Sequence, residues 1–359
     1  TQGCRDDPGL EVYRLRLNAM DLPSLQQEAL GFARAMHDTG LVSDYHADFL
    51  RWLLEQEQKD LIPAALGLSS TGLDSLRCYS DLVFRLIRDA VHPETAQAVY
   101  GLAMLLERGI LYLPPIAPGL WRQIGLTPSA KTAATLAEVF GDRHPPRVFL
   151  LAGVISLLGQ PLGIGQGNNP TCQAARALSK WSYNDPDYLR HLIAWAARFD
   201  SIVMHFEGRP IDSAELAPES ERLVPLDTDP VSIVVVPHLD LIYNEMGRLC
   251  DDRGEDPHRW INPEFHGWWV GRDFVIAVDV ETGALKDYDS FVRRFYGSYH
   301  PFYNGNQPVI HPQPAGLAAT DSTAAFVGWH AITLIRVALD QENIMRVYFY
   351  NPNNDSRQD

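Results

Sequence analysis

The pattern of apolar residues changes along the chain, and this change constrains the fold more than any single motif. Over residues 20–145, apolar side chains recur every three to four positions, as on helices that bury one face, in the stretches 25–37, 47–55, 73–90, 94–108 and 130–140. After about residue 200, the apolar stretches are rich in Val, Ile, Tyr and Phe, which is typical of strands; these are 202–206, 232–237, 274–280, 325–339 and 344–350. Helices followed by strands predict an α+β fold.

The turn His144-Pro145-Pro146 predicts a domain boundary, with a helical domain over 1–145 and a second domain over 146–359. In the second domain, helices are predicted over 172–181, over 186–198 after Asp185 as an N-cap, and over the shorter stretches 239–250 and 289–295. The last two strands are separated by only four residues, 340–343, so we expect an antiparallel hairpin there.

The charge and the cysteines exclude several classes of protein. Thirty Lys and Arg residues against 45 Asp and Glu give a net charge of −15, which disfavours nucleic acid and anionic membranes as partners. Four cysteines, far apart in the sequence, do not form a disulfide framework or a thiolate zinc motif. So few cysteines favour the cytoplasm, although an exported protein with one reactive thiol would look the same.

Four residues of the second domain attract attention by their positions. Cys172 follows a turn rich in Gly and Asn and opens a predicted helix, where the positive helix end and free N–H groups would stabilise a thiolate. Gln166 lies six positions earlier, His330 lies near the start of an apolar strand, and Asn351 ends the next strand. Cys172, His330 and Asn351 each have an ordinary structural explanation when taken alone: a buried thiol, a core histidine and a turn.

Taken in order, Gln166, Cys172, His330 and Asn351 resemble the active site of the papain-like cysteine peptidases. The turn before the cysteine is Gly-rich, Gly-Trp-His-Ala is similar to the Gly-His-Ala of that family, and Asn351-Pro352 is similar to its calpain branch. The resemblance covers about residues 160–355. It implies a cysteine on a central helix, with the histidine and asparagine on an antiparallel β-rich lobe.

The resemblance also implies a role for each residue. Cys172 would be the nucleophile, His330 its general base, Asn351 the residue that orients the imidazole, and Gln166 a donor to the oxyanion. Asp355 is an alternative to Asn351. The expected activity is hydrolysis of a peptide or isopeptide bond in a protein or peptide substrate through a thioacyl intermediate.

Other readings of the same residues stay open. A glutamine deamidase or a transglutaminase would use the same Cys–His dyad, and a non-catalytic module could bind a protein partner through the helical domain. The histidines 258, 266, 300 and 311 lack the close spacing of a metal motif, and the glycines of 163–167 lack the Lys-Ser/Thr of a phosphate loop. We therefore expect no cofactor and no metal. The aromatic residues of 259–303 are more typical of core and loop packing than of a substrate groove, but they would also suit a cleft wall.

Overall fold

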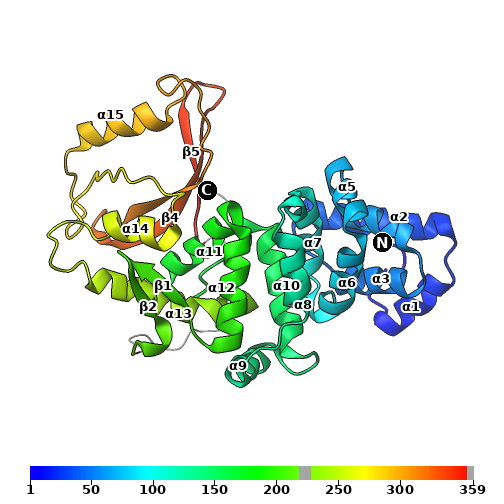
Figure 1. The fold of residues 1–359 in the computed structure, drawn as a ribbon. Coiled ribbons are helices and arrows are strands. Elements are labelled where there is room, and N and C mark those ends of the chain that lie inside the picture. The colour runs from blue at the N-terminus through cyan, green and yellow to red at the C-terminus, as the bar shows by residue number, and fades with distance from the viewer. Residues whose placement is uncertain (218–227, 354–359) are drawn as a thin grey trace. The chain divides into compact units, whose positions relative to one another are not determined.

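The computed structural model describes residues 1–217 and 228–353, and it divides into two compact units, Thr1–Gln160 and Pro161–Asp359 (Figure 1). This division falls later than the boundary expected after residue 145. The reason is helix α10 (Pro146–Gly159), which is apolar on nearly all sides and packs against α7 and α9 of the first unit. Each unit has its own core and is described by itself.

The first unit consists of helices, as predicted for a mostly helical N-terminal region. They are α1 (Leu10–Asn18), α2 (Leu22–Thr39), α3 (Asp44–Glu55), α4 (Ile62–Leu66), α5 (Ser70–Cys78), α6 (Ser80–Ala90), α7 (Ala98–Glu107), α8 (Ile116–Ile124), α9 (Ala130–Phe140) and α10. The predicted helix 73–90 is two helices, because the chain turns at Tyr79. No helix in the described part of the chain has both the length and the apolar character that crossing a bilayer requires.

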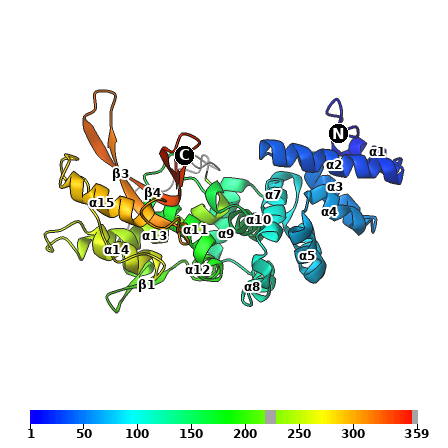
Figure 2. The same ribbon diagram turned by 90° about the horizontal axis from the view of Figure 1, so that it is seen from above.

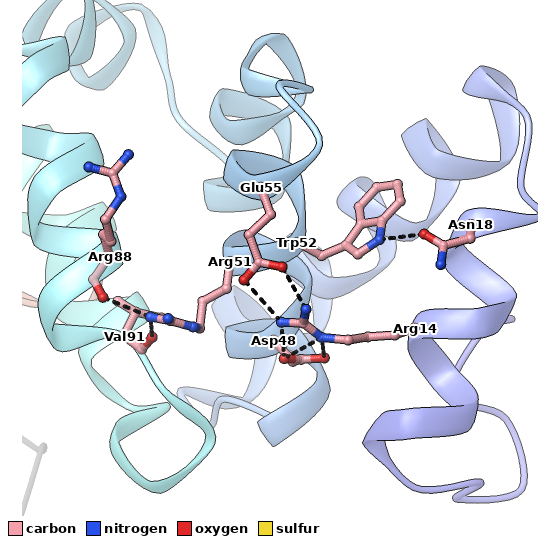
Figure 3. Close-up of polar contacts among 8 residues, drawn as sticks. All are labelled: Arg14, Asn18, Asp48, Arg51, Trp52, Glu55, Arg88 and Val91. Atoms are coloured by element: carbon pink, nitrogen blue, oxygen red, sulfur yellow. Dashed lines mark hydrogen bonds and ion pairs between the residues drawn. The ribbon is translucent and has the colours of Figure 1, made fainter.

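Polar side chains of α3 hold α1 in place (Figure 3). Arg14 on α1 forms a two-pronged contact with Asp48, with Nε–Oδ2 and Nη2–Oδ1 distances of 2.9 and 2.8 Å, and also reaches Glu55 at 2.6 Å. Trp52 donates its indole N–H to Asn18 Oδ1 at 2.9 Å. Bidentate contacts of this kind fix geometry as well as supplying energy.

The same helix is joined to the end of α6 through Arg51 (Figure 3). Its Nη1 donates to the carbonyl oxygens of Arg88 at 2.8 Å and Val91 at 3.0 Å. These carbonyl groups belong to the last turn of α6 and to its C-cap, where no intrahelical donor is available. Polar side chains of α3 thus connect this helix both to α1 and to the end of α6.

The second unit combines helices with two small antiparallel sheets. Its elements are α11 (Cys172–Asn184), α12 (Pro186–Phe199), β1 (Val203–Phe206), β2 (Arg209–Asp212), α13 (Pro230–Arg248), α14 (His258–His266), α15 (Tyr288–Tyr299), β3 (Gln313–Thr320), β4 (Phe326–Leu339) and β5 (Met345–Tyr350). Strands β1 and β2 form a hairpin, and β3, β4 and β5 form a sheet in that order. The α+β class and the β4–β5 hairpin are confirmed.

Two of the predicted strands are wrong. Residues 232–237 belong to helix α13: Asp229 caps this helix by accepting from the Ser232 N–H at 3.0 Å, and Pro230 occupies its first position. A buried helix tolerates the β-branched run because every side of it packs. Residues 274–280 form no strand; they contribute one isolated bridge, between Val278 and Leu285.

Strand β3 and helix α14 were not predicted. The sequence of β3, Gln-Pro-Ala-Gly-Leu-Ala-Ala-Thr, has few of the β-branched and aromatic residues that indicate a strand. It pairs with the first part of β4, so its extended structure is stabilised by this pairing and not by the propensity of its own residues.

Candidate active site

Cys172 is the first residue of helix α11, as the sequence predicted. Its side chain is partly exposed and forms no disulfide. The residue before it, Thr171, makes no side-chain cap, so the N–H groups of the first turn keep their capacity to donate. Helix α11 packs against α12, α13 and β4 (Figure 2). A sulfur atom here lies at the positive end of a well-anchored helix.

Arg176, one turn into α11, fastens this helix to the β3–β4 pair. Its Nη1 donates to the carbonyl oxygens of Ala315 at 3.1 Å and Ile332 at 3.4 Å, and these two residues are cross-strand partners. His330 lies two positions before Ile332 on β4. The start of α11 and the predicted base are therefore in the same neighbourhood of the unit.

His330 and Asn351 are directly hydrogen-bonded, with 2.8 Å between Nε2 and Oδ1. The backbone N–H of Asn353 also donates to Asn351 Oδ1, at 3.0 Å, so this side-chain atom must be the oxygen. Since the oxygen only accepts, His330 Nε2 carries the hydrogen. In the neutral imidazole, Nδ1 then holds a free lone pair, and no described residue contacts it with a hydrogen bond.

The loop that leads to Cys172 is tied to the end of β5 on both sides of Asn351. The Tyr350 hydroxyl donates to the Ile164 carbonyl oxygen, and the Gln166 N–H donates to the Pro352 carbonyl oxygen at 2.9 Å. Residues that are far apart in the sequence thus form one local structure.

The side chain of Gln166 is held within this loop. Its Nε2 donates to the Asn169 carbonyl oxygen at 2.8 Å, and Asn169 Nδ2 returns a bond to the Gln166 carbonyl oxygen at 3.2 Å. One amide hydrogen of Gln166 therefore remains for another acceptor. Its Oε1 is buried, and no described residue donates to it.

The structure does not join all of the predicted residues. Among the described residues, no hydrogen bond links the thiol of Cys172 to His330. The alternative third residue, Asp355, lies outside the described residues.

A second histidine, His258, lies near the same helix, although its sequence pattern did not indicate a place in this site. His258 Nδ1 lies 2.6 Å from Asp256 Oδ1, and its Nε2 lies 3.3 Å from Gln173 Nε2. Arg176 Nη2 donates to Gln173 Oε1, so the other end of this amide is the donor. His258 Nε2 must then accept and Nδ1 must donate to Asp256. The sequence offered only a short Asp-Pro-His spacing as a signal.

Helix α11 buries two cations that no carboxylate of the described residues contacts. Burial lowers the pKa of Arg176, whereas the nearby Tyr243 and Cys172 raise it. Burial, and then the charge of Arg176, lower the pKa of Lys180 to about 7. Lys180 Nζ donates to the Pro312 carbonyl oxygen. Backbone and amide oxygens, rather than acids, solvate both groups.

A cavity of about 940 Å³ adjoins these residues. Its polar lining side chains include Gln173, Arg176, Asp256, His258, Asn262 and His330, and those of Arg259, Asp273, Arg294, His311 and Gln313 also line it. His258 and His330 therefore both face it, and so does the residue next to Cys172. Within residues 1–217 and 228–353, no three His, Cys, Asp or Glu side chains gather as a metal ion would require.

Comparisons with protein-family models, with curated proteins and with solved structures found no significant match to this chain.

Proposed function

We propose that this chain is a cysteine-dependent hydrolase of peptide or isopeptide bonds with a papain-like active site. Cys172 is the nucleophile, His330 the general base, Asn351 the residue that orients it and Gln166 a donor to the oxyanion. One observation carries the proposal: the bond between His330 Nε2 and Asn351 Oδ1 leaves Nδ1 of the imidazole as an acceptor. A base that takes a thiol proton needs such an orientation.

The reaction follows from these positions. His330 Nδ1 takes the proton of the Cys172 thiol, and the thiolate attacks the carbonyl carbon of the substrate. The oxyanion accepts from the Cys172 N–H and from the second amide hydrogen of Gln166. Collapse of this intermediate breaks the C–N bond, the imidazolium protonates the leaving amine, and a thioester remains. Water, deprotonated by His330, then releases the acid and the thiol.

The thiol must approach His330 for the first step. Catalytic hydrogen bonds in free enzymes are often long and shorten when substrate binds. Arg176 places a buried positive charge one turn along α11 from Cys172.

The choice of His330 over His258 rests on hydrogen bonding. His258 Nε2 already accepts from Gln173, and its Nδ1 donates to Asp256, so neither nitrogen is free to take a proton. Nδ1 of His330 has no such partner among the described residues. The two histidines therefore provide a matched pair of variants.

The test is the rate of alkylation of Cys172 by iodoacetamide as a function of pH, read by peptide mass mapping. We expect fast reaction below pH 7 in the wild type and in His258→Ala, and its loss in His330→Ala. Cys78, which is exposed, is the internal control. Equal rates for Cys172 and Cys78 would leave the non-catalytic binding module as the better reading, and loss in His258→Ala alone would move the base to His258.

Hydrolysis is separated from the related chemistries by its product. Deamidation of a glutamine substrate releases ammonia without cutting the chain, and transglutamination joins an added amine. We expect cleavage products from a peptide mixture, absent with Cys172→Ala, and no ammonia release.

A further inference from the structure

The cavity beside His330 has an apolar wall formed by an irregular segment. Six of the seven residues of 274–280 line it: Phe274, Val275, Ile276, Ala277, Val278 and Val280. All six are half-buried, and within residues 1–217 and 228–353 their only β-pairing is the isolated bridge from Val278 to Leu285. Consecutive apolar residues that complete no sheet and remain half-exposed present apolar surface to the cavity that they line.

Helix α15 supplies another part of the cavity wall. Phe291, Phe295 and Tyr299 recur every four residues on one face and line the cavity. Their ring centroids are 5.6 and 5.0 Å apart in succession, so they form a continuous row. The row covers about 12 Å of helix at roughly 1.5 Å per residue. No side chain of α15 is fully buried, and long loops join the helix to its unit at both ends (Figure 1).

The cavity also has a polar group that lacks a partner. Arg176 is only 1% exposed and lines the cavity, yet its Nε donates to no described residue. Its Nη atoms are fully occupied by carbonyl, amide and imidazole acceptors. The Arg176 charge thus lies buried at the cavity wall without a carboxylate partner among the described residues, which favours an incoming carboxylate head by charge attraction.

From these three observations we propose that the cavity binds an unbranched apolar chain with a carboxylate or carbonyl head, as in a fatty acid or a fatty-acylated peptide. The continuous aromatic row suits a chain that runs along the helix, whereas one amino-acid side chain would cover only part of it. The head would lie toward Arg176 and His330. The proposal that the cavity binds such a ligand does not depend on the hydrolase. The further statement that the apolar chain is the acyl part of the substrate rests on the proposed function.

The test is isothermal titration calorimetry of the full chain with hexanoate, octanoate, decanoate and dodecanoate. Each added methylene should strengthen binding by up to about fourfold, from burial of apolar surface. Dodecanol, which has the apolar chain without the charge, should bind at least about tenfold more weakly than dodecanoate, because it lacks the charge that Arg176 attracts.

Two neighbouring residues of α15 give the matched variants. Phe295→Ser removes the central ring of the row and should weaken dodecanoate binding at least about tenfold. Tyr296→Ser changes the next residue, which is 37% exposed and outside the cavity lining, and should leave binding within about twofold. Since neither side chain is fully buried, circular dichroism should show that both variants fold.

Four results would overturn the proposal: no heat of binding with dodecanoate, affinity independent of chain length, equal effects of the two variants, or tighter binding of an unacylated apolar peptide than of dodecanoate. A fatty-acylated peptide and the free acid distinguish the two sources of the chain. Cys172→Ala should bind dodecanoate like the wild type. If dodecanoate binds while the Cys172 alkylation test fails, only the proposed hydrolase is wrong. If the alkylation test succeeds but dodecanoate does not bind, only the proposed fatty-acyl ligand is wrong.

Discussion

The Tyr350 hydroxyl donates a hydrogen bond to the carbonyl oxygen of Ile164, across 186 residues of sequence. Tyr350 ends strand β5 immediately before Asn351, and Ile164 begins the loop that leads to Cys172. Both partners are buried. The bond therefore couples the strand end that bears Asn351, the proposed orienting residue, to the loop that leads to Cys172, the proposed nucleophile.

Removing this bond should disturb the site without removing any of its reacting groups. Tyr350→Phe leaves a buried carbonyl oxygen without this donor, so the free energy of unfolding should fall by about 1–3 kcal/mol. Alkylation of Cys172 should also slow. Tyr348→Phe on the same strand is the control, because no described residue accepts from that hydroxyl. Equal stability of the two variants in urea titrations would contradict the coupling.

The bond between His330 and Asn351 predicts a graded loss of thiol reactivity. Asn351→Ala keeps the base but frees the imidazole to rotate, so the rate at pH 6 should fall by less than it does in His330→Ala. General bases contribute about 10²–10⁴ in rate. Alkylation kinetics of the two variants side by side provide the measurement, and an unchanged rate in Asn351→Ala would show that the asparagine does not orient the base.

Lys180 predicts a dependence of stability on pH. Burial lowers its pKa from the ordinary 10.5 to about 7, so between these values the unfolded chain binds the proton and the folded chain does not. Stability from this group therefore rises with pH across that window, by up to about 1.4 kcal/mol per unit, and the full cost of burial is present below pH 7.

Urea titrations of wild type and Lys180→Met isolate this term, because other titrating groups cancel in the difference. The advantage of the methionine variant should shrink as pH rises from 7 to 10. Lys131→Met, at an exposed position of α9, should show no such trend. A constant difference for Lys180→Met would mean that the lysine stays charged in the folded protein.

In the first unit, the two acids that hold Arg14 should differ in importance. The side chain of Asp48 is 8% exposed and that of Glu55 is 46% exposed. Asp48→Ala should cost about 1.5–3 kcal/mol of unfolding free energy, as expected for hydrogen bonds to charged groups. Glu55→Ala should cost less than about 1 kcal/mol, because exposed ion pairs contribute little. Thermal denaturation of the two variants provides the measurement. A larger loss of stability for Glu55→Ala than for Asp48→Ala would contradict this prediction.

Local patterns predicted elements whose own residues decide their structure. The β4–β5 hairpin was predicted because strand-forming residues flank a short connection, and α11 because a turn gives way to a helical pattern at Cys172. The same reasoning failed at 232–237, where a run of β-branched residues lies inside a capped helix. Propensity cannot decide there, since a fully buried helix and a buried strand are equally apolar.

The sequence by itself determined the α+β class, the helix that begins at Cys172 and the strand that contains His330, because each depends on residues close together in the chain. Only the tertiary structure decided that His330 donates to Asn351 and that Arg176 is buried without a carboxylate partner among the described residues. It also decided that α15 and residues 274–280 line one cavity. Such relationships depend on which surfaces meet when the unit folds. Residues that are neighbours in the sequence do not determine which surfaces pack together. That packing depends on the burial of apolar surface across the whole unit.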